Sequence, residues 1–248
     1  MTTRSQYRGG VLTFYEDSAF ETTRPMSPVF FHDDFLGAAG LAAIPANGSE
    51  AAGVHWAKKI VGAAPPTVAF VGNAIGGQVA CTLTSASQKQ DAVLYWSDQL
   101  AIDVTKGAHF EARFKLSTLP SAAGVQAVVG LAAPWIDGPD NNTCYLQIGA
   151  TANGALLIRS YDGVTQISAA AGLTLANTDW CIARISCSDI TNVSMWLNGA
   201  KATTEGQINF AATGSLAVLQ PYLAVYKPSG TGVATLVVDY VKTWMNRA

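Results

Sequence analysis

Charged side chains are scarce in this chain of 248 residues: only 13% are Asp, Glu, Lys or Arg, and the formal net charge is −2. A typical globular domain carries about twice that share of charged residues. No run of Lys or Arg offers an electrostatic footprint for a nucleic acid, so binding of DNA or RNA is not expected. Such a low charge favours a protein whose surface is largely covered by neighbouring proteins.

Long apolar runs are also missing. No window approaches the ~20 consecutive apolar residues of a membrane-spanning helix, so no membrane partner is expected. The first ten residues contain Arg4 and Arg8 but no apolar core after them, which argues against a signal peptide.

Cysteine is infrequent and scattered, at positions 81, 144, 181 and 187, and no C-x-x-C pair occurs. This spacing supports neither a zinc site nor a thioredoxin-like motif. Cys181 and Cys187 fall in one predicted strand, which would place their Cα atoms roughly 20 Å apart, beyond the ~7 Å limit for a disulfide. The thiols are therefore predicted to be reduced and structural.

Motifs for catalysis are absent. No strand carries two glutamates at alternating spacing, which is what two carboxylates facing one cleft would require for glycoside hydrolysis. Glu111 stands alone on its strand beside Arg113 and Lys115, as expected of a solvated face. No G-x-S-x-G, H-E-x-x-H, Walker or dinucleotide-binding motif occurs. The chain is therefore predicted not to be an enzyme, with no catalytic residue, no metal and no cofactor.

Short β-rich runs make up most of the chain, separated by Gly, Pro, Asn and Asp. In His109–Leu116, apolar and polar residues alternate strictly, which predicts one buried and one solvated face. Asn153-Gly154, Asp162-Gly163 and Asn198-Gly199 are tight-turn signals. This pattern predicts one all-β antiparallel sandwich domain over residues 29–248. The clearest predicted strands are His55–Val61, Gln78–Thr84, Ala92–Trp96, His109–Leu116, Val125–Leu131, Cys144–Ile148, Ala155–Tyr161, Trp180–Cys187, Val193–Leu197, Leu219–Tyr226 and Ala234–Trp244.

Residues 1–28 differ from the rest and are predicted to form an extended N-terminal arm. Pro25 and Pro28 favour extended backbone, and a fully extended run of this length would reach roughly 90 Å. A disordered tail or an ordinary edge strand remains an alternative, but apolar side chains are costly to leave in water. We expect the arm to dock on a neighbouring subunit. The candidate arm residues are Tyr7, Arg8, Val11, Leu12, Phe14, Tyr15, Phe20 and Arg24.

One loop, Trp135–Asn142, could hold a ligand. Its oxygen donors beside an aromatic ring suit calcium or a sugar stacked on Trp135. The alternative is a proline-containing turn whose Asp and Asn side chains cap their own backbone. The candidate ligand residues are Trp135, Asp137, Asp140 and Asn141.

Four segments resemble the concanavalin A-like lectin/glucanase (laminin-G-like) jelly roll: Phe31–Leu36, Trp180–Ile185, the hairpin Met195–Gly199 and Leu236–Val241. The resemblance implies an antiparallel two-sheet jelly roll whose first and last strands pair, with Phe31–Phe35 beside Leu236–Tyr240. Catalytic members of the glucanase branch carry an E-x-D-x-x-E strand, which this sequence lacks.

The chain also resembles structural proteins of tailed bacteriophages. This narrower resemblance lies in the segments Arg8–Tyr15, Glu21–Pro25, Phe35–Gly37, Gln220–Pro228 and Asp239–Val241. It implies a virion component made in the host cytoplasm and placed on the capsid surface. The predicted function is that of a capsid decoration or cement protein, a homotrimer whose arm binds the major capsid protein and copies of itself. The alternative is a carbohydrate-binding, receptor-binding module of a phage tail or fibre, with a surface glycan as partner.

Overall fold

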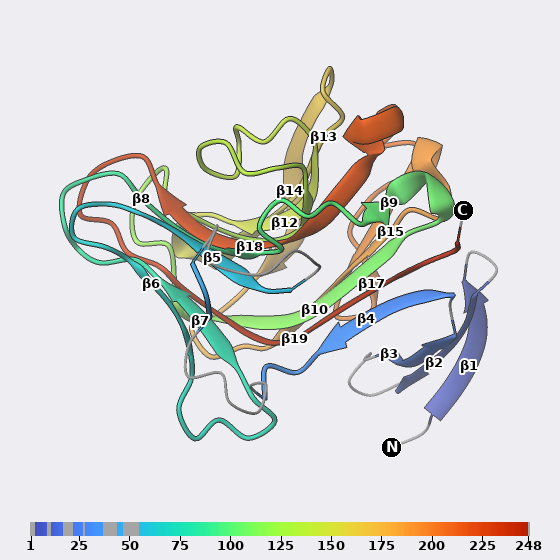
Figure 1. Cartoon of the computed structure of the whole chain (residues 1–248), viewed down its shortest axis with the longest axis horizontal. Helices are drawn as coiled ribbons and strands as arrows, with labels where there is room; N and C mark the ends of the chain where they lie inside the picture. The colour runs from blue at the N-terminus through green and yellow to red at the C-terminus, as the bar shows by residue number, and fades with distance from the viewer. Residues whose placement is uncertain are drawn as a thin grey trace.

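A computed structural model describes residues 3–8, 11–16, 22–26, 28–36, 44–46 and 55–247. These residues form β-strands joined by loops and four short 3₁₀ turns, and two eight-stranded antiparallel sheets pack face to face (Figure 1). The predicted all-β, two-sheet jelly-roll sandwich is therefore confirmed. No helix among the described residues has the length and apolarity needed to cross a membrane.

The sheet that contains both long strands β10 and β19 is called the β10 sheet. Its strands follow the order β17 (Ala200–Lys201), β16 (Ser194–Leu197), β15 (Cys181–Ser186), β10 (His109–Thr118), β19 (Thr235–Met245), β7 (Val79–Thr82) and β6 (Thr67–Phe70), and β4 (Val29–Asp33) also pairs with β19.

The opposing sheet is called the β12 sheet. Its order is β14 (Gln166–Thr174), β13 (Ala155–Tyr161), β12 (Tyr145–Ala150), β11 (Gln126–Ala132), β18 (Val218–Lys227), β8 (Gln90–Tyr95) and β5 (Ala57–Val61), and the two-residue strand β9 (Ile102–Asp103) also pairs with β18.

The main hydrophobic core lies between the two sheets. On β10 the apolar alternation points Phe110, Ala112, Phe114 and Leu116 into it, all buried. Because successive side chains of a strand point to opposite faces, residues 109, 111, 113 and 115 lie on the outer face of the same sheet. All four cysteines are buried free thiols of this core, at positions 81, 144, 181 and 187.

The first sandwich strand pairs with the last, as the sequence predicts, but in a different register. β4 lies along Val241–Met245, whereas β7 lies along Thr235–Val238, where Phe31–Phe35 was expected. The cause is local: Asp33 Oδ1 accepts the Phe35 N–H at 2.8 Å, and Phe35 adopts a positive φ of 52°. This turn ends β4 at Asp33, so the register prediction was wrong.

The predicted arm contains an antiparallel sheet of its own, formed by β1 (Thr3–Arg8), β2 (Val11–Glu16) and β3 (Thr22–Met26). Its strands pair with one another, and Figure 1 shows this sheet near β4. The segment therefore folds back on itself rather than running as one extended strand.

Several turns form where the sequence predicts them. Asn198 and Gly199 adopt φ values of 47° and 79° between β16 and β17, and Asn153 and Gly154 adopt 64° and 76° before β13. β14 was not predicted from the sequence, because its central residues 169–172, three alanines and a glycine, have low β-propensity.

Candidate functional site

The N-terminal residues predicted to bind a neighbour lie in the small sheet. Tyr7 and Arg8 belong to β1, Val11, Leu12, Phe14 and Tyr15 to β2, and Arg24 to β3. Phe14 and Tyr15 are half-buried, and Phe20 lies outside the described residues. A docking role for this segment stays a prediction.

The predicted ligand loop lies on the outer face of the β12 sheet, the face turned away from the sandwich core. A second apolar cluster fills this face, with Tyr95, Tyr145 and Tyr222 fully buried and Trp135 packed against them. In Figure 1 the yellow-green connection between β11 and β12 rises on the side of this sheet opposite to β10 and β19. The loop therefore covers part of a face that would otherwise be open.

Trp135 is held in place on both sides. Its ring nitrogen donates to Asp91 Oδ2 at 2.8 Å, and its backbone N–H donates to Asp98 Oδ1 at 2.8 Å. The Lys59 ammonium lies 4.5 Å from the ring centroid, a cation–π contact. Trp135 thus attaches the loop to the sheet. Lys59 covers one side of its ring, so a sugar ring cannot stack on that side.

Asp91 is the buried carboxyl beneath this loop. Burial raises its pKa to about 7, even though the hydrogen bonds from Trp135 and from the Gly138 backbone favour the charged form. A nearby negative charge on Asp137 acts in the same direction as burial. The loop is therefore attached to a group that titrates near neutral pH.

The other predicted loop residues separate in space. Asp137 forms an ion pair with Lys89, and the Asn141 side chain donates to the Asp137 carbonyl oxygen, as in a self-capping turn. Asp140 reaches across to β13 and pairs with the Arg159 guanidinium, while Gln126 Nε2 donates to Asp140 Oδ2 at 2.7 Å. Of the four candidates, Asp140 lines a cavity on this face.

That cavity has a volume of about 280 Å³ and opens on the outer face of β11 to β14. Arg159 Nη1 donates to Gln126 Oε1 at 2.9 Å, and the guanidinium lies 5.3 Å from the Tyr145 ring. Its side chain is only 6% exposed, and burial lowers the pKa of Arg159 to about 10. The lining residues are Gln126, Asp140, Gly149, Ala150, Thr151, Leu157, Arg159, Gln166 and Ser168.

Two neighbours shape this arginine site. A Cβ at Gly149 would come within 2.8 Å of Arg159 Cδ, so the glycine makes room for the arginine side chain. Gln147, the register partner of Arg159 on β12, is fully buried, and its amide has no hydrogen-bond partner among the described residues. A buried polar group without a partner is costly, so Gln147 lowers the stability of this part of the sheet, but it does not line the cavity.

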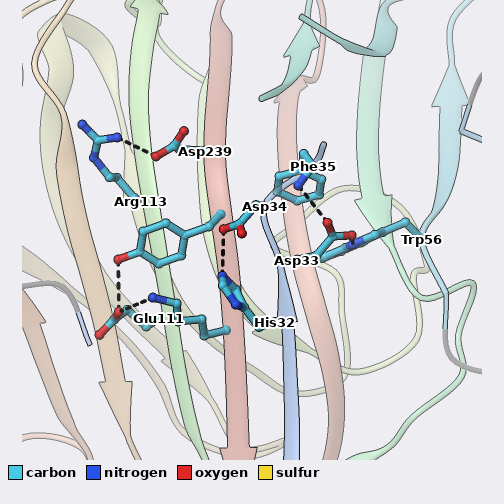
Figure 2. A network of polar contacts seen from close by, with 10 residues as sticks. His32, Asp33, Asp34, Phe35, Trp56, Glu111, Arg113 and Asp239 are labelled. Atoms are coloured by element: carbon cyan, nitrogen blue, oxygen red, sulfur yellow. Dashed lines mark hydrogen bonds and ion pairs between the residues drawn. The ribbon is translucent and has the colours of Figure 1, made fainter. Parts of the chain in front are cut away.

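A different network occupies the outer face of the β10 sheet (Figure 2). Glu111 is fully buried: Oε2 accepts from Arg184 Nε at 2.8 Å and Nη2 at 2.5 Å, and Oε1 accepts from the Tyr240 hydroxyl at 3.1 Å. Lys242 Nζ lies 4.0 Å from the same carboxylate. The prediction that Glu111 lies on a solvated face was therefore wrong, because residues of β15 and β19 enclose it.

The neighbouring charges on that face are more open. Arg113 Nη1 pairs with Asp239 Oδ2 at 2.5 Å, and the ring of Trp180 lies 4.2 Å from the Arg113 guanidinium. Asp33 and Asp34 point to different partners, Asp33 to the Trp56 ring nitrogen at 2.7 Å and Asp34 to His32 at 2.8 Å (Figure 2). No cluster of metal-ligating side chains occurs among the residues that the structure describes.

No protein-family model matches the chain, and no curated protein matches it in sequence. Solved structures do share its fold. A β-1,3-glucanase from Mycobacterium marinum aligns with a TM-score of 0.55 at 16% identity, over 86% of this chain and 97% of that one. A pseudo β-1,3-glucanase of Mycobacterium tuberculosis gives 0.54 at 16%, over 88% and 98%. The carbohydrate recognition domain of Emp47p gives 0.51 at 10%, over 83% and 95%.

These likenesses show that the chain has a concanavalin A-like jelly-roll fold. They also correct the prediction that the chain is not an enzyme, since the same fold occurs in a protein named a glucanase and in one named a pseudo-glucanase. None of the comparisons supports a virion role.

Sequence reasoning missed Arg159, Gln126 and Gln166, although it predicted the strand Ala155–Tyr161 correctly. The available signal was an arginine that directly follows four apolar residues of a predicted strand. A charge at such a position is either solvated or paired, and only the assembled sheet shows which.

Proposed function

We propose that this chain is a carbohydrate-binding jelly-roll domain that takes a saccharide in the Arg159 cavity. The observation that carries the proposal is the cavity itself, lined by six polar side chains from three strands and two loops next to small apolar residues. Sugars present many hydroxyl groups that both donate and accept hydrogen bonds. Arginine and glutamine donors, with carboxylate and hydroxyl acceptors, match that chemistry.

The ion pair at the cavity also supports saccharide binding. Arg159 is pre-positioned by Asp140, Gln126 and the space left at Gly149, so little side-chain freedom remains to be lost on binding. Leu157 supplies an apolar wall against which the carbon face of a pyranose can pack. The fold shared with a carbohydrate recognition domain and a glucanase is consistent with this choice of ligand.

A glycan array that includes β-1,3-linked gluco-oligosaccharides tests the proposal, followed by calorimetry on the best binder. Arg159→Leu should weaken binding by at least about tenfold. Arg113→Leu is the matched control, because Arg113 also pairs with one aspartate and contacts one aromatic ring, but on the opposite sheet. Equal affinity of wild type and Arg159→Leu for every glycan would refute the proposal.

The same oligosaccharides can be assayed for release of reducing ends. Cleavage that disappears in Arg159→Leu but persists in Arg113→Leu would support the site and extend the proposal to hydrolysis. Cleavage that is insensitive to Arg159→Leu would place the activity elsewhere and contradict it.

We propose the virion cement role as a second candidate. What supports it is that β1, β2 and β3 form a separate small sheet whose strands pair with one another. Co-sedimentation of full-length chain with purified capsids, compared with a Phe14→Asp and Tyr15→Asp double variant, tests it. Equal sedimentation of both proteins with the capsids, or of neither, would contradict the cement role of this segment.

A further inference from the structure

The main strand paths of the two sheets end at β17, β6, β5 and β14, and three of these four end strands carry features that discourage pairing with another chain. In the β10 sheet, β17 has two residues and β6 has four, the latter directly after Pro65 and Pro66. In the β12 sheet, β5 carries Lys58 and Lys59, and the Lys58 N–H donates to the Pro45 carbonyl oxygen at 2.8 Å. Short edges, prolines, lysines and partial cover are the usual means of protecting an edge strand.

The fourth edge, β14, lacks most of this protection. It is nine residues long with the sequence QISAAAGLT, which contains no charged residue and no proline. From Gln166 to Ala170 it pairs residue by residue with β13, and a register shift follows near Gly172, where φ is 73°. Its other edge has no partner strand among the described residues.

The hydrophobic core is also open at this edge. Every second side chain of β14 packs against the main core but remains partly exposed: Ile167, Ala169, Ala171 and Leu173. The residues between them face solvent. A strand added beside β14 would cover these side chains and satisfy its free backbone groups together. Apolar burial and backbone pairing therefore act at the same place.

We propose that β14 pairs antiparallel with β14 of a second copy of this chain, which joins the two β12 sheets into one continuous sheet. A two-fold axis places like residues near one another, so an uncharged segment can pair with itself without repulsion between like charges. The same self-pairing of β5 would bring Lys58 and Lys59 of the two copies together, and the like charges would repel. The small net charge of −2 adds little repulsion between the two copies.

The pairing also affects the saccharide site. Gln166 and Ser168 line the cavity, so each cavity would lie beside the added strand, with both cavities on the same outer face. A ligand with two binding units could then occupy both, which raises its apparent affinity. This consequence rests on the proposed function, whereas the pairing itself does not.

Sedimentation velocity of the full-length chain over a range of concentrations tests the pairing. We expect a wild-type dimer and, for Ala170→Lys, a dissociation constant at least about tenfold higher, because like charges come close at the two-fold axis. Ala69→Lys is the matched control, an exposed alanine on edge strand β6, and it should remain dimeric. Circular dichroism and calorimetry verify that Ala170→Lys is folded.

A monomeric wild type would overturn the proposal, as would a dimer or trimer that Ala170→Lys leaves unchanged. Failure of the pairing and failure of the saccharide site are distinguishable. A folded Ala170→Lys monomer should bind a short monovalent saccharide with wild-type affinity, whereas Arg159→Leu should lose that binding and remain dimeric.

Discussion

The outer faces of the two sheets each carry a buried arginine paired with a carboxylate, but one carboxylate is buried and the other is exposed. On the β10 sheet the Glu111 side chain is 0% exposed and the Arg184 side chain 8% exposed. On the β12 sheet the Arg159 side chain is 6% exposed, but Asp140 is 41% exposed and borders a cavity of about 280 Å³. The closed pair is held by hydrogen bonds within the protein, from Arg184 and Tyr240 to Glu111, and serves structure. An open pair beside a cavity keeps surface available for a ligand.

Among the substitutions that test this difference, we expect the largest loss of stability at Glu111. Glu111→Gln keeps the shape of the side chain but leaves Arg184 and Lys242 buried without their counter-charge. We expect a loss of about 3–5 kcal/mol in the free energy of unfolding, measured by urea denaturation. Asp140→Asn, the equivalent change in the open pair, should cost less, about 1–3 kcal/mol, because Asp140 is 41% exposed and the buried Arg159 keeps its hydrogen bond to Gln126. Equal losses in the two variants would remove the distinction between the pairs.

A second prediction concerns Asp91, which accepts a hydrogen bond from Trp135 and so attaches the loop Trp135–Asn142 to the β12 sheet. Its folded pKa of about 7 exceeds its unfolded value, so the protonated form favours folding. This stabilisation is fully present below about pH 4 and is lost as pH rises through 7. Asp91→Asn should therefore be more stable than wild type at pH 8, by about 1–4 kcal/mol, with a flatter pH profile.

Thermal unfolding of both proteins between pH 4 and 9 checks this sign. Asp179→Asn, at an exposed carboxyl, is the control and should reproduce the wild-type profile. A stability of Asp91→Asn that falls below wild type at pH 8 and matches it at pH 4 would reverse the assignment.

The smallest expected change in stability comes from narrowing the cavity. Gly149→Ala adds a methyl group within 2.8 Å of Arg159 Cδ, so the arginine must shift. We expect saccharide binding to weaken by about tenfold, with a change in unfolding free energy of only about 1 kcal/mol. Gly72→Ala, where no atom lies within 4 Å of the added carbon, is the control. If both variants bind like wild type, the cavity wall at Gly149 has no part in recognition.

The sequence predicted the core better than the outer faces, for a physical reason. Alternation along β10 identifies Phe110 and Phe114 as buried, because the period of a strand is local. The burial of Glu111 depends instead on Arg184 and Tyr240, which lie on strands far away in sequence. A charged residue on an alternating strand looks the same in sequence whether water or a distant arginine faces it.

The candidate site was predictable only in part. The loop Trp135–Asn142 was recognised by its turn and donor residues, but its contacts with Asp91, Lys59 and Arg159 come from three other strands. β14 was missed since alanine and glycine carry little β-propensity, and pairing with β13 alone places it in the sheet. The cavity exists only where these elements meet.

The most direct test of the central claim is a crystal structure of the full-length chain with the best-binding oligosaccharide from the array. We expect the sugar in the cavity between β11 and β14, with hydrogen bonds to Arg159 and Gln166. A sugar bound instead on the outer face of the β10 sheet, against Trp180 and Arg113, would contradict it.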